Sequence, residues 1–293
     1  MPQVSRRDFI VTGAAAGAVA TLGTLPLSAE NHAATDWVTL GNSGVKVTRL
    51  AFGTGSFNGE TQRSIGQEGF NRLVRHAYDR GIRFFETADS YENMHEMLGI
   101  ALQGIPRDSY RLMTKVTTYD DTDPQKKIDE LRRQIRSDHF DILLLHWQHT
   151  GTWVEDTRHW QDAVLVAQKR DAVVARGASV HGLPALRQVP GFDWLQVAMI
   201  RVNHKGTRMD AEVADAPVQG NVPEVVSHIH QAKAKGMGVI SMKLVGEGAF
   251  NREDRQKAMR FAFQNAKIDC ATVGYKNNAE IDEAIENINL AYA

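Results

Sequence analysis

The sequence is 293 residues long, which is enough for one large domain or for two smaller ones. Lys and Arg number 34 and Asp and Glu 35, so no net field would attract nucleic acid or an anionic membrane. The one cysteine, Cys270, excludes an intramolecular disulfide framework and an all-cysteine metal or iron–sulfur site, and we interpret it as a buried apolar thiol.

The first thirty residues differ in composition from the rest of the chain. The segment Ser5–Ile10 carries Arg6 and Arg7 and precedes a run of Ala, Gly, Val and Leu that ends at Leu27. The residues Leu27–Ala29 offer a small-residue cleavage site, and the whole pattern resembles a twin-arginine export signal. The run is too weakly hydrophobic for a stable membrane span, although a retained amphipathic or membrane anchor is an alternative.

This resemblance to an export signal has consequences for the whole protein. It implies a removable signal peptide over residues 1–29 and a mature domain over residues 30–293. Because the twin-arginine export machinery carries folded proteins, often with cofactor in place, we expect the chain to be exported folded. The expected destination is the periplasm or another extracytoplasmic space.

Short apolar runs alternate with amphipathic segments from Val47 onward, which is the pattern of repeated βα units. Eight runs predict eight strands, the number of a (β/α)8 TIM barrel. The predicted strands are Val47–Gly53, Ile82–Ala88, Tyr110–Val116, Phe140–Trp147, Val174–Val180, Leu195–Asn203, Val239–Val245 and Cys270–Gly274. No linker divides Thr35–Ala293, although two doubly wound halves with an open sheet are an alternative.

Helix boundaries are marked by particular residues in the segments between these runs. Asp123 and Asn221, each followed by a proline within two residues, predict helix starts. Gly81 and Gly236 predict helix ends. The positions of these helix-boundary residues therefore agree with the predicted alternation of strands and helices.

Four polar residues lie at or just after predicted strand ends, where a barrel of this kind carries its chemistry. Glu86 lies near the end of the second strand, Tyr91 follows it, and Lys115 and His146 end the third and fourth. A Tyr hydroxyl can donate a proton to a carbonyl oxygen, but its ordinary pKa of about 10 makes a neighbouring cation useful. Lys115 can supply that cation, Glu86 can hold the ammonium, and His146 can orient the substrate oxygen. Taken singly, each residue also has a structural interpretation.

Several stretches together resemble the aldo-keto reductase family over nearly all of Trp37–Ala293. They are the opening hairpin Trp37–Val47, the turn Gly53–Gly55, the motif Phe84–Tyr91 continued by Glu96 and Gly99, and the strands Thr114–Val116 and Asp141–Trp147. The resemblance implies that Tyr91 is the proton donor, that Lys115 adjusts its pKa and that His146 binds the substrate oxygen.

The fourth member of the catalytic set departs from the family. The family usually has Asp five residues before the Tyr, where this chain has Glu86, and Asp89 is the alternative carboxylate. Glu is longer by one methylene, about 1.5 Å of bond length. The resemblance therefore implies a Glu86–Lys115 pair with altered geometry, and a slower enzyme if the site is loosened.

The resemblance also implies contacts to a nicotinamide cofactor. The implied residues are Ser179, Asn203, Gln196, Gly274, Lys276 and Glu280. In the segment that contains Lys243, Gly246 and Gly248, the glycines would also let backbone N–H groups approach the pyrophosphate, and a plain flexible turn is the alternative. Gln196 is a stand-in, because Met199 replaces the family's Gln, and Val180 and Met242 replace its Asn and its stacking Tyr. Lys276 can meet a 2′-phosphate, which favours NADPH over NADH.

The leading hypothesis is NADPH-dependent reduction of an aldehyde, ketone or sugar carbonyl. The alternatives are a nicotinamide-binding sensing barrel with weak catalysis, and an exported sugar-binding barrel without nucleotide. The segment Lys205–Gly220 is expected to form a substrate loop. The pair His228 and His230 has the wrong helical spacing for a shared ligand, so no metal site is expected. We expect a small-molecule substrate, no nucleic-acid partner and a monomer.

Overall fold

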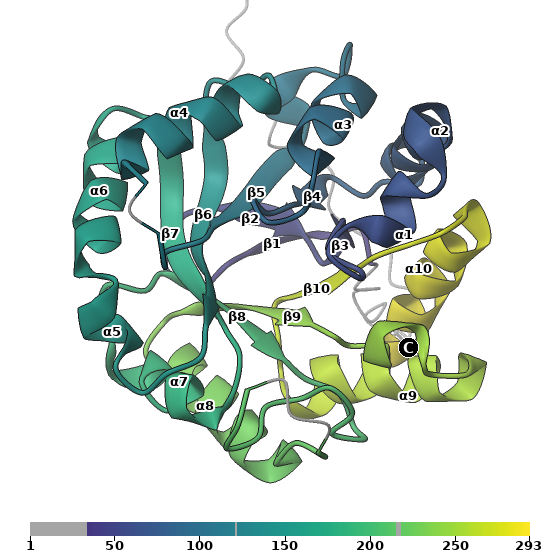
Figure 1. Ribbon diagram of the computed structural model, residues 1–293. Coiled ribbons are helices and arrows are strands. Elements are labelled where there is room, and N and C mark those ends of the chain that lie inside the picture. The colour runs from purple at the N-terminus through teal and green to yellow at the C-terminus, as the bar shows by residue number, and fades with distance from the viewer. Residues whose placement is uncertain (1–33, 121, 215–217) are drawn as a thin grey trace, which may run out of the picture. The chain divides into compact units, whose positions relative to one another are not determined.

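The computed structural model describes residues 34–120, 122–214 and 218–293, and within them eight parallel strands close into a barrel (Figure 1). The barrel strands are β3 Leu50–Gly53, β4 Phe84–Glu86, β5 Arg111–Val116, β6 Phe140–Gln148, β7 Val173–Val180, β8 Val197–Arg201, β9 Gly238–Met242 and β10 Cys270–Val273. The predicted (β/α)8 barrel is confirmed. The alternative of two doubly wound halves is wrong, because β10 pairs with β3 and closes the sheet.

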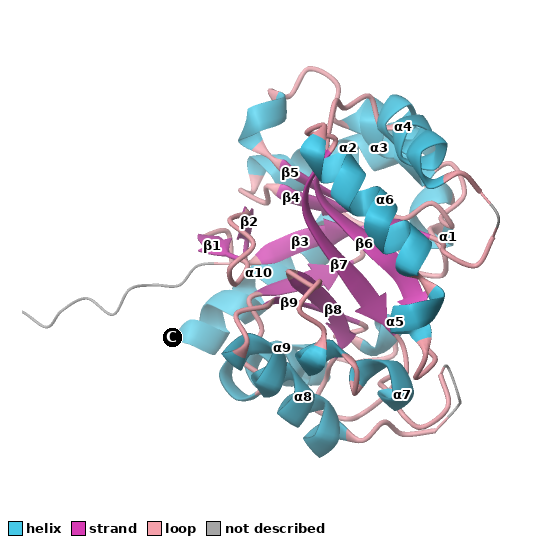
Figure 2. Cartoon of the chain, turned by 90° about the vertical axis from the view of Figure 1, so that its left-hand side faces the viewer, coloured by secondary structure: helices cyan, strands magenta, loops and turns pink. Residues whose placement is uncertain are grey.

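Helices surround the strands in both views of the chain (Figures 1 and 2). The longer helices are α2 Gly66–Asp79, α3 Met94–Ala101, α4 Pro124–Gln134, α6 Arg158–Lys169, α8 Val222–Ala234, α9 Arg252–Arg260 and α10 Asn278–Tyr292. Short helical segments are α1 Glu60–Arg63, α5 Trp153–Asp156, α7 Leu183–Leu186, η1 Arg107–Ser109, η2 Val189–Gly191, η3 Gly246–Gly248 and η4 Phe261–Asn265.

The predicted helix boundaries are confirmed where they depend on particular residues. The Asp123 carboxylate caps α4 by accepting the second and third backbone N–H groups of the helix, at 3.0 and 3.2 Å. The Asn221 side chain caps α8 in the same way. Gly81 and Gly236 follow α2 and α8 with φ of 97° and 83°, a conformation that favours glycine.

The first predicted strand, Val47–Gly53, is wrong as a single element. Its first residues belong to β2 Lys46–Thr48, which pairs antiparallel with β1 Trp37–Thr39, whereas β3 pairs parallel with β4 and β10. The two pairings belong to different sheets, so the chain leaves one sheet and enters the other at Arg49. Leu40 and Val47 of this hairpin pack into the cluster inside the barrel, which closes the amino-terminal end of the strands as expected.

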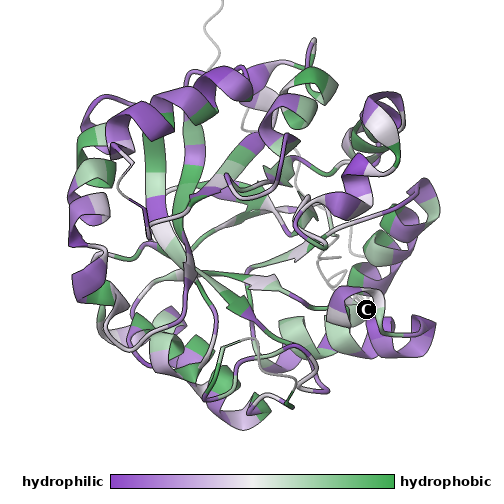
Figure 3. Ribbon diagram, viewed as in Figure 1, coloured by the Kyte–Doolittle hydropathy of each residue, from purple (hydrophilic) through white to green (hydrophobic). Residues whose placement is uncertain are grey.

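Successive residues of the strands pack into two separate apolar cores. Ile142 and Leu144 of β6 belong to the cluster inside the barrel, whereas Leu143 and Leu145 belong to the cluster between strands and helices. The strands accordingly show mostly hydrophobic colours, and the helices carry hydrophilic stretches on their outer sides (Figure 3). Polar side chains replace apolar ones inside the barrel at the carboxyl ends of the strands.

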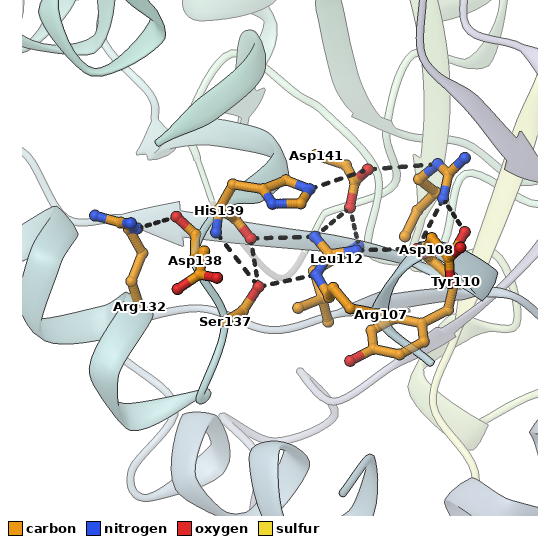
Figure 4. Close-up of polar contacts among 10 residues, drawn as sticks. Arg107, Asp108, Tyr110, Leu112, Arg132, Ser137, Asp138, His139 and Asp141 are labelled. Carbon is orange, nitrogen blue, oxygen red and sulfur yellow. Dashed lines mark hydrogen bonds and ion pairs between the residues drawn. The ribbon is translucent and has the colours of Figure 1, made fainter. Parts of the chain in front are cut away.

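A buried polar cluster ties β5 to β6 at their amino ends (Figure 4). The Asp141 carboxylate accepts from Arg107 Nη2 at 2.7 Å and from the Leu112 N–H at 2.8 Å, and it lies 3.4 Å from Arg111 Nε. Arg107 also donates to Ser137 Oγ at 2.8 Å. This cluster lies at the opposite end of the strands from His146 and Lys115, so it serves the stability of the barrel.

Candidate active site

A cavity of about 810 Å³ lies at the carboxyl ends of the strands. One part of it is lined by Tyr91 and His146, and the rest continues past the turn Lys243–Gly248 to Lys276 and helix α10. This volume is within the range of sites for small molecules and cofactors. The site predicted at the strand ends therefore coincides with a cavity large enough to hold a ligand.

Glu86 and Lys115 form a buried ion pair beside Tyr91. The Lys115 Nζ contacts Glu86 Oε1, donates to the Thr87 carbonyl at 3.1 Å and lies 4.8 Å from the centre of the Tyr91 ring. Tyr91 in turn packs on the turn after β3, where a Cβ at Gly55 would lie 2.5 Å from its hydroxyl. The longer Glu86 side chain thus reaches Lys115 directly.

Burial is the main influence on the pKa values of Tyr91 and Lys115. It raises the pKa of the Tyr91 hydroxyl above its usual value, and the negative charges of Asp89 and Glu247 act in the same direction. Burial lowers the pKa of the Lys115 ammonium, and the positive charge of Lys243 adds to this, while the Glu86 contact opposes it. Tyr91 therefore carries its proton at neutral pH.

His146 lies with its ring perpendicular to that of Tyr91, the ring centres being 5.7 Å apart. Burial lowers the pKa of His146 well below its usual value, with smaller contributions from Lys115 and other nearby cations, so the ring is neutral. Its Nδ1 lies 3.2 Å from Ser90 Oγ. When the Ser90 hydroxyl donates to Nδ1, the ring proton is on Nε2, where it can be donated to a ligand.

Asp89 lies close to His146 but is engaged elsewhere. Its Oδ1 is 4.0 Å from His146 Nδ1, beyond hydrogen-bond distance. Its two carboxylate oxygens accept from the Thr117 N–H at 2.8 Å and the Thr117 hydroxyl at 2.9 Å. These two hydrogen bonds connect the Asp89 side chain to the loop after β5. Glu86 is the carboxylate that contacts Lys115.

Five of the residues predicted to bind cofactor line the cavity: Lys243, Gly248, Gly274, Lys276 and Glu280. Lys243 Nζ contacts the carboxylate of Glu247, which is also 3.2 Å from Arg208 Nε. The Lys276 N–H donates to the Glu280 carboxylate at 2.8 Å. The far part of the cavity therefore combines cations, which can meet phosphate, with nearby carboxylates.

The structure does not bring Gln196, predicted as a cofactor residue, to the lining of the cavity. Gln196 precedes β8 at the amino-terminal end of the strand, and its Oε1 accepts from the Arg176 N–H at 3.1 Å. Sequence spacing suggested this residue only because Met199 occupies the expected position, and a change of three residues along a strand moves a side chain about 10 Å.

Three other predicted cofactor residues are absent from the described lining of the cavity: Ser179, Asn203 and Gly246. Ser179 Oγ accepts from the Trp147 N–H at 3.0 Å. Asn203 holds the loop after β8, donating to the Thr207 carbonyl at 2.7 Å. At Gly246, with φ of 61°, a Cβ would meet the Phe250 ring at 2.8 Å. In this structure the three residues support the walls of the cavity.

Sequence reasoning missed His181 and Arg201, which are among the buried polar residues that line the cavity. Arg201 ends the otherwise apolar strand β8, in phase with Met199 and Asn203. A charged residue at the end of an apolar strand, on the face that points into the barrel, was the signal that could have found it.

Comparison with known proteins identifies the family. The family model described as the aldo/keto reductase family matches residues 49–291, and the model of the twin-arginine translocation signal sequence matches residues 3–23. No helix in the described part of the chain is long and apolar enough to cross a membrane.

Curated relatives match only segments of the chain. A probable aldo-keto reductase from Glycine max is 31% identical over 41% of this chain and 38% of its own length. The methylglyoxal reductase DkgB of Salmonella typhi is 28% identical over 48% of this chain and 52% of its own length. The chain thus spans about two fifths to one half of the lengths of these relatives.

Solved structures share the fold over most of their length. An aldo-keto reductase structure from Pseudomonas aeruginosa has a TM-score of 0.70 at 20% identity, covering 88% of this chain and 97% of that one. An aldo-keto reductase from Klebsiella pneumoniae in complex with NADPH has a TM-score of 0.67 at 12% identity, covering 87% and 89%. Because the family model covers most of the sequence, the chain belongs to the aldo/keto reductase family.

Proposed function

We propose that this protein reduces the carbonyl group of a small aldehyde, ketone or sugar to an alcohol, using hydride from NADPH. The observation that supports this most strongly is the buried Tyr91, which keeps its proton beside the Glu86–Lys115 pair and faces His146 in one cavity. This combination suits protonation of a carbonyl oxygen as its carbon is reduced. Membership of a reductase family supports the same reaction class.

The cavity fits a nicotinamide dinucleotide in two respects. Lys243 and Lys276, which are far apart in the sequence, both line the cavity. There they would meet the pyrophosphate and the 2′-phosphate, respectively. The hydroxyls of Thr272 and Tyr275 also belong to lining residues, and within the described chain both are buried without a hydrogen-bond partner. A buried hydroxyl of this kind is stabilised when a ligand supplies the partner.

Different side chains of this protein would bind the carbonyl oxygen and supply its proton. The bound cofactor supplies a hydride equivalent to the carbonyl carbon. His146 Nε2–H donates to the carbonyl oxygen and fixes its position, and the Tyr91 hydroxyl transfers its proton to that oxygen. Lys115, held by Glu86, places positive charge near the Tyr91 ring and so stabilises the negative charge that develops on Tyr91.

NADPH is the proposed cofactor over NADH because Lys276 stands after β10, beside the amino end of α10. A helix start and an adjacent ammonium both attract a phosphate. Glu280 lies in the first turn of the same helix, and its negative charge opposes the binding of a phosphate there. Use of both NADPH and NADH would be explained by this carboxylate. The aldo-keto reductase of Klebsiella pneumoniae with the same fold is in complex with NADPH.

We also propose that residues 1–29 are removed and that residues 30–293 function, folded and monomeric, in the periplasm or another extracytoplasmic space. The matched export signal over residues 3–23 supports this. The Leu27–Ala29 cleavage site lies outside the described residues. Mass measurement of the exported protein tests the boundary, and a mass that includes residues 1–29 contradicts it.

The central experiment compares the protein with Tyr91→Phe. NADPH binding is followed by fluorescence, and turnover by NADPH oxidation with a panel of aldehydes, ketones and sugars. We expect turnover to fall at least about a hundredfold in Tyr91→Phe while the nucleotide dissociation constant changes little. Binding without turnover in either form would favour the sensing barrel, and failure to bind either nucleotide would contradict the cofactor assignment.

A further inference from the structure

Glu247, on the turn after β9, holds two cations of the cavity wall. Lys243 Nζ contacts its carboxylate, and Arg208 Nε, from the loop after β8, lies 3.2 Å from its Oε2. All three residues line the cavity. Among the residues that the structure describes, Glu247 is the carboxylate partner of both cations, and neither has a second one. We call these three residues the Glu247 cluster.

The carboxylate is the most buried member of the Glu247 cluster. The Glu247 side chain is 11% exposed, whereas the side chains of Lys243 and Arg208 are 24% and 59% exposed. A carboxylate that is taken out of water is stabilised only when nearby cations compensate its charge. The two cations therefore keep Glu247 in the cavity wall, and an anion with more charge would compete with it for them.

The backbone at Glu247 is strained. Its φ is 53° and its ψ is 40°, and its neighbours Gly246 and Gly248 have φ of 61° and 87°. The two glycines adopt this left-handed conformation readily, but a residue with a Cβ does so at a cost in free energy. Strain of this kind is found most often in functional sites. A side chain is thus kept at a position where glycine would relieve the strain, which indicates a role for the Glu247 carboxylate.

The Glu247 cluster lies within electrostatic reach of the proposed reaction centre. Burial is the main cause of the raised pKa of Tyr91 and the lowered pKa of Lys115, and the charges of Glu247 and Lys243, respectively, add to these shifts. Lys276, where the 2′-phosphate is expected, follows the neighbouring strand β10. A dinucleotide with its nicotinamide at Tyr91 and its 2′-phosphate at Lys276 has its diphosphate between these two places. The cations of the Glu247 cluster are therefore in position to meet the diphosphate.

We propose that Glu247 is an internal competitor of the nucleotide: its carboxylate holds Lys243 and Arg208 in the free protein and is displaced from both by the diphosphate. This rests on the proposed cofactor, since the diphosphate belongs to NADPH. A diphosphate carries more negative charge than one carboxylate and offers more acceptor oxygens to the two cations. Nucleotide binding therefore exchanges one set of ion pairs for another, and the Glu247 charge lowers the affinity.

Glu247→Gln tests the competition directly, because the amide keeps the size of the side chain and removes its charge. The dissociation constant of NADPH is measured by fluorescence, in the absence of a carbonyl substrate. We expect it to fall at least about fivefold in Glu247→Gln, since no carboxylate then competes for the two cations. An unchanged or larger dissociation constant in folded Glu247→Gln overturns the proposal.

Glu212→Gln is the matched control for the change in net charge. Glu212 is also an ion-pair partner of an arginine, accepting from Arg187 at 2.9 and 2.6 Å, but it is absent from the described cavity lining. The dissociation constant of NADPH for this variant should equal that of the unmodified protein. An equal fall in the two variants would show that net charge alone strengthens binding, and it would overturn the assignment to Glu247.

A double-mutant cycle with Arg208→Gln measures whether Glu247 and the nucleotide share this cation. In the unmodified protein, Arg208→Gln removes a partner of the diphosphate and a partner of its competitor, so the two effects offset each other. With Glu247→Gln already in place, only the first effect remains, and Arg208→Gln should raise the dissociation constant at least about fivefold. The fold change should be smaller when Glu247 is present, and an equal fold change in both backgrounds overturns the competition at Arg208.

The outcomes separate this proposal from the proposed cofactor. Inorganic pyrophosphate is the second probe, and its binding is measured by titration calorimetry. If NADPH binds to none of the proteins, the cofactor assignment fails and pyrophosphate decides. Tighter pyrophosphate binding in Glu247→Gln than in the unmodified protein supports the competition, and equal binding or none overturns it. If Glu247→Gln tightens NADPH binding but no protein turns over a carbonyl compound, the competition stands and the reductase function does not.

Discussion

Glu86 and Lys115 show how a one-methylene difference is accommodated in the proposed catalytic group. Both side chains are almost fully buried, and each is the other's charge partner. Removing one charge from such a pair leaves the other in a medium that disfavours it, while replacing Glu with Asp keeps the charge and moves it back by about 1.5 Å. The two substitutions therefore separate the effect of charge from the effect of length.

We expect Glu86→Gln to lower kcat at least about tenfold, because an uncompensated Lys115 loses its proton and no longer supports Tyr91. Glu86→Asp should lower kcat less. Thermal unfolding is measured in parallel, so that loss of fold is distinguished from loss of catalysis. Full activity in folded Glu86→Gln would contradict the assigned role and would direct attention to Asp89.

At this scale the sequence predicted the residues whose position follows from strand ends, namely Glu86, Tyr91 and His146. It did not predict the hydrogen-bond partners of the side chains at the strand ends. Ser179 and Asn203 lie at strand ends as expected, but their polar atoms bond to neighbouring backbone. The Trp147 partner of Ser179 lies 32 residues away in the sequence, so local spacing does not encode it.

At the scale of elements, a buried histidine joins helix α3 to strand β5. His95 Nε2 lies 2.7 Å from Thr114 Oγ1, and the ring packs edge-on against Phe140. Burial lowers the pKa of His95 from 6.5 to about 3, with a smaller contribution from Lys127. Between those pH values the unfolded chain binds a proton that the folded chain does not, so stability falls as pH falls.

This predicts acid sensitivity that one substitution reduces. From about pH 7 to about pH 5, His95 should account for a loss of about 2 kcal/mol in the free energy of unfolding, because the slope is about 1.4 kcal/mol per pH unit below the unfolded pKa of about 6.5. Urea unfolding at both pH values measures it. The loss should be smaller by that amount in His95→Gln, and unchanged in the exposed control His230→Gln. Equal losses in all three proteins would refute the linkage.

The order of elements could be predicted because strand and helix periodicities alternate so regularly. The exception, the division of Val47–Gly53 into β2 and β3, has a physical cause. Its apolar residues are all buried, Val47 and Ala51 inside the barrel and Leu50 and Phe52 between strands and helices. Hydrophobic pattern alone therefore cannot show that the chain changes sheets at Arg49.

At the scale of the whole molecule, the two ends of the barrel have different roles. The Asp141 cluster lies at the amino ends of β5 and β6, and the cavity lies at the carboxyl ends. A substitution in the first should therefore alter stability without altering catalysis.

We expect Asp141→Ala to destabilise the protein by about 3–5 kcal/mol, because Arg107 and the Leu112 N–H lose a buried partner. At temperatures where the variant is folded, kcat and KM should equal those of the unmodified protein. Asp129→Ala is the control, since Asp129 is a half-exposed partner of Arg132 and Arg170 and its loss should cost less than about 1 kcal/mol. A changed KM in Asp141→Ala would show that the two ends are coupled.

Closure of the barrel depends on two strands that lie far apart in the sequence, β3 and β10. Ala271 of β10 pairs with Leu50 of β3, so one edge of β3 has no partner strand until β10 has been synthesised. A chain ending before Cys270 would leave β3 and β9 as two open edges that invite aggregation. The matched export signal over residues 3–23 precedes the barrel in the sequence, and the barrel sheet closes only when β10 is added. If the folded chain is exported through the pathway of the matched signal, we therefore expect translocation to follow the synthesis of β10.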